Sequence, residues 1–342
     1  MRIWITVDTE GTHGSHPFQQ MVWGDVDDSG KHWGVPRICD IAEEYGFTVS
    51  FFVDVYEYSF YGKQELKKLV RYIIGRGHRV ELHTHPAWSS SDVRDSFSIQ
   101  EMKRKHSCFD FQRPWMHQYS VEEQIEILKH GQQLLEDWSG TKIDVHRAGG
   151  YGLNRDTLLA LRETGFRIDS SMFNSHENSL FTPVSNFPHK IEGVLEIPVT
   201  HICLEKVLRF ISIPLFKRSR IVKTDINSAD FDTITEFIDQ GARIALPVTN
   251  LFLHSYSFLN WNNGFNSFRH DSESEERFRS VLAFCRARGY QSFNPGTFDI
   301  VESKSTISDW VPKRTVDVAF KDYVYRRLAR TGFSKRAVAN TR

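Results

Sequence analysis

The chain has 342 residues, of which 40% are hydrophobic, and this length fits one large α/β barrel-like domain with a tail. Lys plus Arg and Asp plus Glu both number 43, so no net positive charge favours nucleic acid as a partner. The four cysteines lie far apart and form no CxxC pair, so neither a zinc ribbon nor a disulfide framework is indicated.

The N-terminus and the hydropathy both predict a soluble cytoplasmic protein. Met1-Arg2 leads directly into the apolar run Ile3–Val7, without a segment typical of a signal peptide. No apolar run reaches the roughly 18 residues that are needed to span a bilayer.

Segments with the hydrophobic periods of strands and helices alternate along the chain. We expect strands at Ile3–Asp8, Phe47–Val55, Gly77–His83, Ile143–His146, Phe166–Asp169, Leu195–Val199, Ile244–Val248 and Leu251–His254. Helices are expected at Val35–Tyr45, at Lys63–Arg76, from the capping-box pattern at Ser120 to Gly140, at Asn154–Thr164 and at Ser274–Arg288. This alternation predicts a parallel α/β fold, either open or closed into a barrel.

The stretch His83-Thr84-His85-Pro86 ends the third expected strand. Residues two apart in a strand point to the same face, with their backbones roughly 7 Å apart. Two imidazoles on one face can converge on a single metal ion, at about 2.0–2.1 Å each for zinc. Taken alone, the pair is equally consistent with two surface histidines on a loop.

Other chemically active residues also fall at the ends of expected strands. They are Asp8 with Glu10, His146-Arg147, Asp169 and His254. In parallel α/β barrels, active residues gather at the C-terminal ends of the strands. Each of these residues alone also fits a structural role, such as a turn cap, an ion-pair partner or a hydrogen-bonded core histidine. Their shared placement favours a single catalytic site.

Five short motifs, in order along about residues 1–300, resemble the polysaccharide deacetylases, the NodB-homology group of carbohydrate esterases. The motifs are Ile5–Glu10, His83–Pro86, Arg147–Tyr151, Asp169–Ser171 and Leu251–His254. The chain looks closest to the branch linked to lipopolysaccharide and O-antigen biosynthesis.

The resemblance implies a distorted (β/α) barrel that removes an N-acetyl or, less often, an O-acetyl group from a sugar. It implies one divalent metal ion, with zinc as the expected ion, held by a carboxylate and the two histidines His83 and His85. An aspartate serves as general base and a histidine, here His254, as general acid. Arg147 would pair with and orient the base carboxylate.

This sequence departs from the family pattern in three places. Position 9 is Thr, so the two acids of the first motif are Asp8 and Glu10; we assign Asp8 as base and Glu10 as metal ligand, and the exchanged roles stay open. The histidines are two apart instead of four. Gly149-Gly150 replaces a proline-containing turn, so a backbone N–H of Gly150 or Tyr151 could bind the substrate oxyanion.

We divide the chain into a catalytic domain, residues 1–300, and a basic extension, residues 301–342. Residues 311–342 carry nine Lys and Arg against two Asp, a net charge of +7, and Phe320, Val324 and Leu328 recur every four residues. A basic amphipathic helix there could touch an anionic membrane, where a lipid-linked sugar is presented, but a solvated tail fits equally well. Aromatic residues in the segment 97–119 could stack on sugar rings or pack a loop.

Two other functions remain open. One is a different metal-dependent amidohydrolase on a (β/α) barrel; in those enzymes HxH ends the first strand, whereas here the first strand ends at Asp8. The other is a non-catalytic glycan-binding relative, which the loss of the base or the acid would mark. The expected partner is a nucleotide- or lipid-linked sugar or glycan precursor.

Overall fold

A computed structural model describes residues 1–11, 18–25, 29–86, 113–173, 185–210, 213–262, 267–298 and 313–319. Within these ranges the main sheet has nine strands in the order β10-β1-β2-β3-β4-β5-β7-β6, and β13 also pairs with β1. The strands are β1 Arg2–Thr9, β2 Val49–Asp54, β3 Arg79–Thr84, β4 Val145–Ala148, β5 Ile168–Asp169, β6 His189–Ile191, β7 Val194–Glu196, β10 Val248–His254 and β13 Gln291–Ser292. Only the β6–β7 pair of this sheet is antiparallel.

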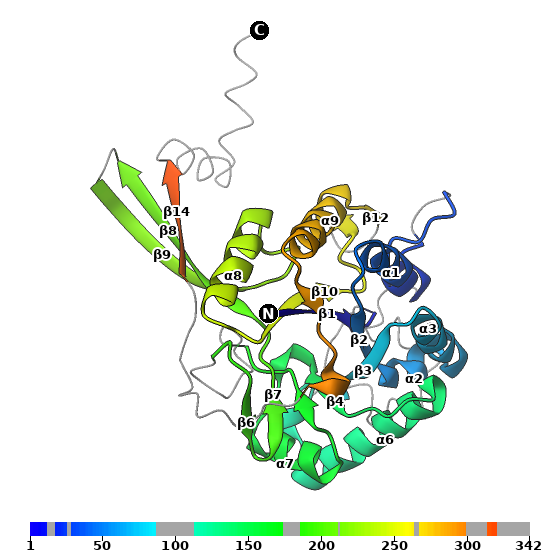
Figure 1. Ribbon diagram of the computed structural model, residues 1–342. Coiled ribbons are helices and arrows are strands. Elements are labelled where there is room, and N and C mark those ends of the chain that lie inside the picture. Colours follow the sequence, from blue (N-terminus) through cyan, green and yellow to red (C-terminus); the bar gives the residue numbers. More distant parts are fainter. Residues whose placement is uncertain are drawn as a thin grey trace.

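Helices surround the curled sheet (Figure 1). The α-helices are α1 Val35–Glu44, α2 Tyr58–Tyr61, α3 Lys63–Gly75, α6 Val121–Ser139, α7 Arg155–Glu163, α8 Phe231–Arg243 and α9 Ser272–Ala287. Short helical turns are η1 Gln19–Trp23, η2 Val55–Glu57, η4 Met116–Gln118, η5 Gly149–Tyr151 and η6 Pro295–Thr297. No helix among the described residues is long and apolar enough to cross a membrane.

Both faces of the sheet are buried, which explains the continuous apolar runs of its strands. Along β1, Ile3, Ile5 and Val7 enter the larger core cluster, which also contains the apolar residues of the helices. Trp4 points to the other face and packs in a second cluster with Phe52. The structure therefore confirms an α/β fold of the distorted (β/α) barrel type, in which β10 and β6 lie at the two ends of the strand order.

Most expected elements are present, with shifts at their ends, but one expected strand is wrong. Residues 244–247 are not in a strand: Ile244 caps α8, and Ala245 adopts a φ of 58°. The backbone N–H of Leu246 then bonds back to the carbonyl of Gly241, and β10 begins only at Val248. The apolar residues that suggested a strand instead end a helix, α8, which the sequence analysis did not predict.

Residues 201–225, which lie between β7 and α8 in the chain, form mostly a long hairpin. Its strands are β8 His201–Phe210 and β9 Ile213–Lys223, and β14 Lys313–Ala319 adds to β8 in parallel. Figure 1 shows this three-stranded ribbon projecting from the barrel. A separate antiparallel pair is formed by β11 Leu259–Asn262 and β12 Ser267–His270. The expected amphipathic helix with Phe320, Val324 and Leu328 lies outside the described residues.

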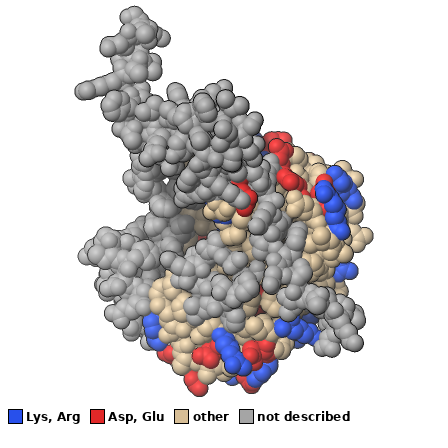
Figure 2. Space-filling view, turned by 90° about the vertical axis from the view of Figure 1, so that its left-hand side faces the viewer, with Lys and Arg blue, Asp and Glu red and all other residues tan. Residues whose placement is uncertain are grey.

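Charged side chains show no dominant sign on the described part of one face of the molecule. On the face shown in Figure 2, the described Lys and Arg side chains are interspersed with Asp and Glu. This agrees with the equal numbers of acidic and basic residues in the sequence.

Candidate active site

Four strands of the sheet, the pairs β10–β1 and β3–β4 with β2 between them, bring the predicted site residues to one edge. Asp8 of β1 is in register with His254 of β10, and His83 of β3 is in register with Arg147 of β4. All four lie at or near the C-terminal ends of their strands. Parallel pairing therefore brings together residues that are far apart in sequence, as the strand-end pattern predicted.

Glu10, His83 and His85 form a compact group of possible metal ligands. One ligand atom from each lies within 4.8 Å of the other two. The Oε2 atom of Glu10 is 2.7 Å from Nε2 of His85 and 3.5 Å from Nε2 of His83. The two imidazole rings lie 4.9 Å apart at an angle of 83°.

A hydrogen bond orients His83 toward this group. Its Nδ1–H donates to the backbone carbonyl of Arg147 at 2.9 Å, so in the neutral ring the lone pair is on Nε2, which faces Glu10. Histidine ligands of metals are held in this way by a carbonyl or carboxylate on the other nitrogen. Two imidazole nitrogens and one carboxylate oxygen are also the donor set of many catalytic zinc sites. The residues present therefore fit a divalent ion.

The charges in this group are mutually stabilised. Burial acts to raise the pKa of Glu10, but His85 and His83 outweigh burial and hold that pKa well below its usual range. Burial acts to lower the pKa of His83, but the carboxylates of Asp8 and Glu10 outweigh it and raise that pKa. Glu10 is therefore ionised over the physiological range, as a metal ligand must be.

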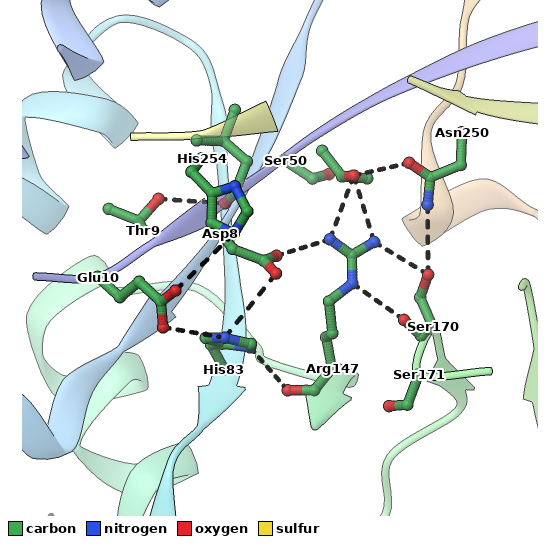
Figure 3. A network of polar contacts seen from close by, with 12 residues as sticks. Asp8, Thr9, Glu10, Ser50, His83, Arg147, Ser170, Ser171, Asn250 and His254 are labelled. Carbon is green, nitrogen blue, oxygen red and sulfur yellow. Dashed lines mark hydrogen bonds and ion pairs between the residues drawn. The ribbon is translucent and has the colours of Figure 1, made fainter. Parts of the chain in front are cut away.

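Arg147 lies in the interior with an exposed fraction of 0% and holds the carboxylate of Asp8 (Figure 3). Its Nη1 donates to Oδ1 of Asp8 at 2.7 Å. Both Nη atoms also donate to Oγ1 of Thr6 at 3.2 Å, and Nε and Nη2 donate to the carbonyl and Oγ of Ser170. The phenyl ring of Phe52 lies 4.1 Å from Cζ of the guanidinium. Together, these contacts fix the orientation of the guanidinium group.

The second oxygen of Asp8 faces the possible metal ligands. Its Oδ2 lies 3.9 Å from Nε2 of His83, whereas Oδ1 is occupied by Arg147. Burial acts to raise the pKa of Asp8, but Arg147, His83 and His254 outweigh burial and lower it. Asp8 is therefore ionised at neutral pH and has one oxygen that Arg147 does not hold.

His254 lies on the other side of Glu10, with its Nε2 3.9 Å from Oε1 of that residue. Its ring stacks on Tyr256, with centroids 4.9 Å apart and an angle of 19°. The ring also packs edge-to-face with Phe252, with the ring centroids 5.0 Å apart. Burial, followed by the positive charge of Lys223, lowers the pKa of His254. The two aromatic contacts fix the plane of the imidazole.

The turn η5 is built around two side chains that require glycine. A Cβ atom on Gly149 would overlap the imidazole of His85, and a Cβ on Gly150 would overlap the indole of Trp115. Gly150 and Tyr151 adopt φ values of 57° and 59°, in the left-handed region. Trp115 belongs to the aromatic segment singled out in the sequence, and it packs on this turn.

Replacing Gly149 by alanine tests this packing. We expect Gly149→Ala to displace His85 and to weaken metal affinity by about 10- to 100-fold, the range seen when the support of a ligand is removed. Gly75→Ala is the matched control, because a Cβ there meets nothing within 4 Å. Competition with a chromophoric chelator measures the affinity. Equal affinity in the two variants would contradict the assigned contact.

Asp169 belongs to one of the five sequence motifs, but its hydrogen-bond partners are not the metal ligands. It accepts hydrogen bonds from Nδ1–H of His146 at 2.7 Å and from Oγ of Ser171 at 2.8 Å. Nε2 of His146 in turn contacts Oγ1 of Thr84 at 3.0 Å. This buried pair supports the strands that carry His83 and Arg147.

Two residues near the site were missed in the sequence. Lys223, at the end of β9, donates to the hydroxyl of Tyr151 at 2.8 Å, and its ammonium lies 3.7 Å from the centroid of Phe252. Asp225 bridges to Phe252, two residues before His254. The hairpin that carries Lys223 has no motif, so no local pattern pointed to this placement.

Two buried carboxyl groups behind Glu10 were also missed. Both oxygens of Glu57 accept from the backbone N–H of Gly11 at 2.9 Å, next to Glu10. Burial raises the pKa of Asp54 to about 8, and burial together with Asp54 raises that of Glu57. Asp54 is the last residue of β2, just as Asp8 is the last but one of β1, and this position at a strand end was a signal in the sequence.

No curated protein sequence matches this chain. Solved structures that resemble it include a family 4 carbohydrate esterase from Streptomyces lividans, solved with acetate (10% identity, 91% of this chain and 97% of that chain, TM-score 0.44). Another is a putative polysaccharide deacetylase from Mycobacterium smegmatis (16% identity, 87% and 94%, TM-score 0.44). A third is a pseudoenzyme of the same esterase family from Bacillus anthracis (10% identity, 93% and 69%, TM-score 0.42). At these scores the structural likeness carries no argument.

The family comparison agrees with the motifs. The matched segment contains His83, His85 and Arg147, while Asp8, Glu10 and His254 lie outside it. Residues 19–168 match the polysaccharide deacetylase family, and this match supports the family that the motifs indicated.

Proposed function

We propose that the protein is a metal-dependent carbohydrate deacetylase that removes an acyl group, chiefly N-acetyl, from a sugar or glycan precursor. The observation that carries the proposal is the convergence of Glu10, His83 and His85 within 4.8 Å, beside a carboxylate that Arg147 holds. The family match of residues 19–168 supports the acyl-sugar substrate.

A bound divalent ion, with zinc as the proposed identity, would acidify a water molecule and polarise the acyl carbonyl. Asp8 then accepts the proton of the attacking water through its free Oδ2, while Arg147 keeps the carboxylate ionised and oriented. His254 protonates the departing amine, which is otherwise a very poor leaving group. We propose backbone N–H groups of Gly150 and Tyr151 as donors to the oxyanion.

The geometry favours Asp8 as base and Glu10 as ligand over the exchanged assignment. Glu10 contacts both histidines, at 2.7 and 3.5 Å. Of the two histidines, Asp8 contacts only His83, at 3.9 Å. Its other oxygen accepts a hydrogen bond from Arg147. A carboxylate that is held by an arginine and keeps one free oxygen suits a base.

The same residues bear on the two rival functions. A non-catalytic glycan-binding relative would lack the base or the acid, but Asp8 and His254 are both present and face Glu10. An amidohydrolase-type barrel would carry HxH at the end of its first strand, whereas here His83 and His85 flank the last residue of the third strand, Thr84.

The biological setting is a further part of the proposal. We place the enzyme in the cytoplasm, in the biosynthesis of cell-surface polysaccharide or lipopolysaccharide, with a nucleotide- or lipid-linked precursor as substrate. The net charge of +7 over residues 311–342 motivates peripheral contact with an anionic membrane.

Acetate release from a panel of nucleotide-linked, lipid-linked and polymeric N-acetyl sugars tests the proposal. We expect release from at least one class, loss of release with a chelator, and recovery when zinc is restored. Release that continues unchanged in chelator would exclude metal dependence. Absence of release from every N-acetyl and O-acetyl sugar, with metal bound, would exclude the deacetylase.

A further inference from the structure

The hairpin β8–β9 delivers two oppositely charged side chains to the active site. Lys223 is its last residue, and Asp225 follows as the chain rejoins β10 beside Phe252. Both side chains are largely buried, with exposed fractions of 18% for Lys223 and 9% for Asp225. Their placement close to His254 is therefore fixed by the fold and is unlike that of a surface ion pair.

The distance between the two charged groups matches that of two donors and acceptors bridged by one oxygen atom. Nζ of Lys223 lies 3.8 Å from Oδ2 of Asp225, which is too long for a direct hydrogen bond. An oxygen placed about 2.8 Å from both atoms fits this separation and makes two normal hydrogen bonds. A hydroxyl group accepts from the ammonium and donates to the carboxylate at the same time.

The rest of each side chain is already held. Lys223 donates to the hydroxyl of Tyr151 at 2.8 Å, and its ammonium lies on the face of Phe252. Oδ1 of Asp225 accepts from the backbone N–H of Asn227 at 2.8 Å, so Oδ2 is the oxygen turned to Lys223. The pair is thus preorganised, which is what selective recognition of a hydroxyl requires.

The pair lies within reach of the reacting groups. The ammonium of Lys223 lies 3.7 Å from the ring centroid of Phe252, and that centroid lies 5.0 Å from the centroid of the His254 ring. Tyr151, which contacts Lys223, belongs to the turn that packs against His85 and Trp115. A hydroxyl held between Lys223 and Asp225 would therefore be on the sugar ring that carries the scissile acyl group.

We propose that Lys223 and Asp225 form a recognition site for one sugar hydroxyl and determine which sugar the enzyme accepts. This inference rests on the proposed deacetylase function and deepens it. Loss of a hydrogen bond to a charged group weakens recognition by about 10- to 100-fold. The kcat/KM of the wild type should therefore be about 10- to 100-fold lower for one monodeoxy analogue than for the parent N-acetyl sugar.

The test is a cycle of protein variants and deoxy sugars. In Lys223→Met and in Asp225→Asn, the ratio of kcat/KM between the parent sugar and that deoxy analogue should fall, because each variant removes one of the two hydrogen bonds to the hydroxyl; in the double variant it should fall to about 1. Methionine keeps the stem over Phe252, and asparagine keeps the oxygen that binds Asn227. Lys190→Met, an exposed lysine on the edge strand β6, is the matched control and should keep the full ratio.

The outcomes separate this inference from the deacetylase proposal. Variants that keep the parent-to-deoxy ratio, or lose equally on every sugar, would overturn the recognition site. If Lys223→Met does not fold, as judged by circular dichroism, the parent-to-deoxy ratios of Lys223→Arg and Asp225→Asn test the recognition site instead. If the wild type binds the sugars without hydrolysing them, the same ratios are read from dissociation constants by saturation-transfer NMR, and only the deacetylase proposal fails. A wild type that binds no acetylated sugar overturns both.

Discussion

Alanine at His83 or His85 should remove the bound metal ion and lower kcat/KM for acetyl hydrolysis by about 10³-fold or more. The ion would contribute several kcal/mol to the transition state, and each 1.4 kcal/mol is about tenfold in rate. Wild-type protein should contain about one ion per chain. Elemental analysis of the purified variants measures the loss directly, independently of any substrate.

The controls for this prediction follow from the structure. His189→Ala, on the edge strand β6, removes a histidine away from the site and should keep both metal and activity. Glu10→Gln should lose metal together with the histidine variants, because Glu10 contacts both rings. Full metal content in the double variant of His83 and His85 would show that these residues are not the ligands.

The alternation of strands and helices could be predicted because its signals are local. The pattern at Ser120 is one example: the capping box is present, with Ser120 N–H donating to Glu123 at 2.8 Å and Glu123 N–H donating to Ser120 at 3.3 Å. Gly140 ends the same helix in the left-handed conformation. Caps of this kind depend on residues three or four apart, which a sequence displays directly.

The gathering of Asp8, His83, Arg147 and His254 could also be predicted, because parallel strands align their C-terminal ends. The contact between Arg147 and Asp8 is present at 2.7 Å, as expected from the motifs. Local signals do not reveal which side chains reach the site from elsewhere. Lys223 reaches the site on a hairpin, in which it pairs with His201, 22 residues earlier in the chain.

Apolar residues near a helix end were misread for a similar reason. Ile244 and Leu246 have the composition of a strand, yet Ile244 caps α8 and Leu246 folds back on Gly241. The hydrophobic period over five residues does not distinguish these two structures. Only packing against the rest of the barrel decides between them.

Asp8→Asn should keep the fold and the metal but lower turnover by about 10²- to 10⁴-fold, the usual contribution of a general base. Asparagine retains the oxygen that accepts from Arg147, but its amide cannot accept the proton of the attacking water. Metal analysis and kcat together identify the role. Loss of metal in Asp8→Asn with retention in Glu10→Gln would establish the exchanged assignment.

His254→Ala should lower amide hydrolysis by a similar factor of about 10²- to 10⁴-fold, while an activated aryl ester should be affected much less. The amine leaving group must be protonated as the C–N bond breaks, whereas an aryl oxide departs without a proton. Nε2 of His254 lies 3.9 Å from Oε1 of Glu10, whereas His85 contacts Oε2, so His254 is placed beside the metal ligands, where it can meet a leaving group. Comparing kcat/KM for an N-acetyl sugar and for an aryl acetate separates chemistry from packing. Equal losses on both substrates would mean that His254 acts only by packing between Phe252 and Tyr256.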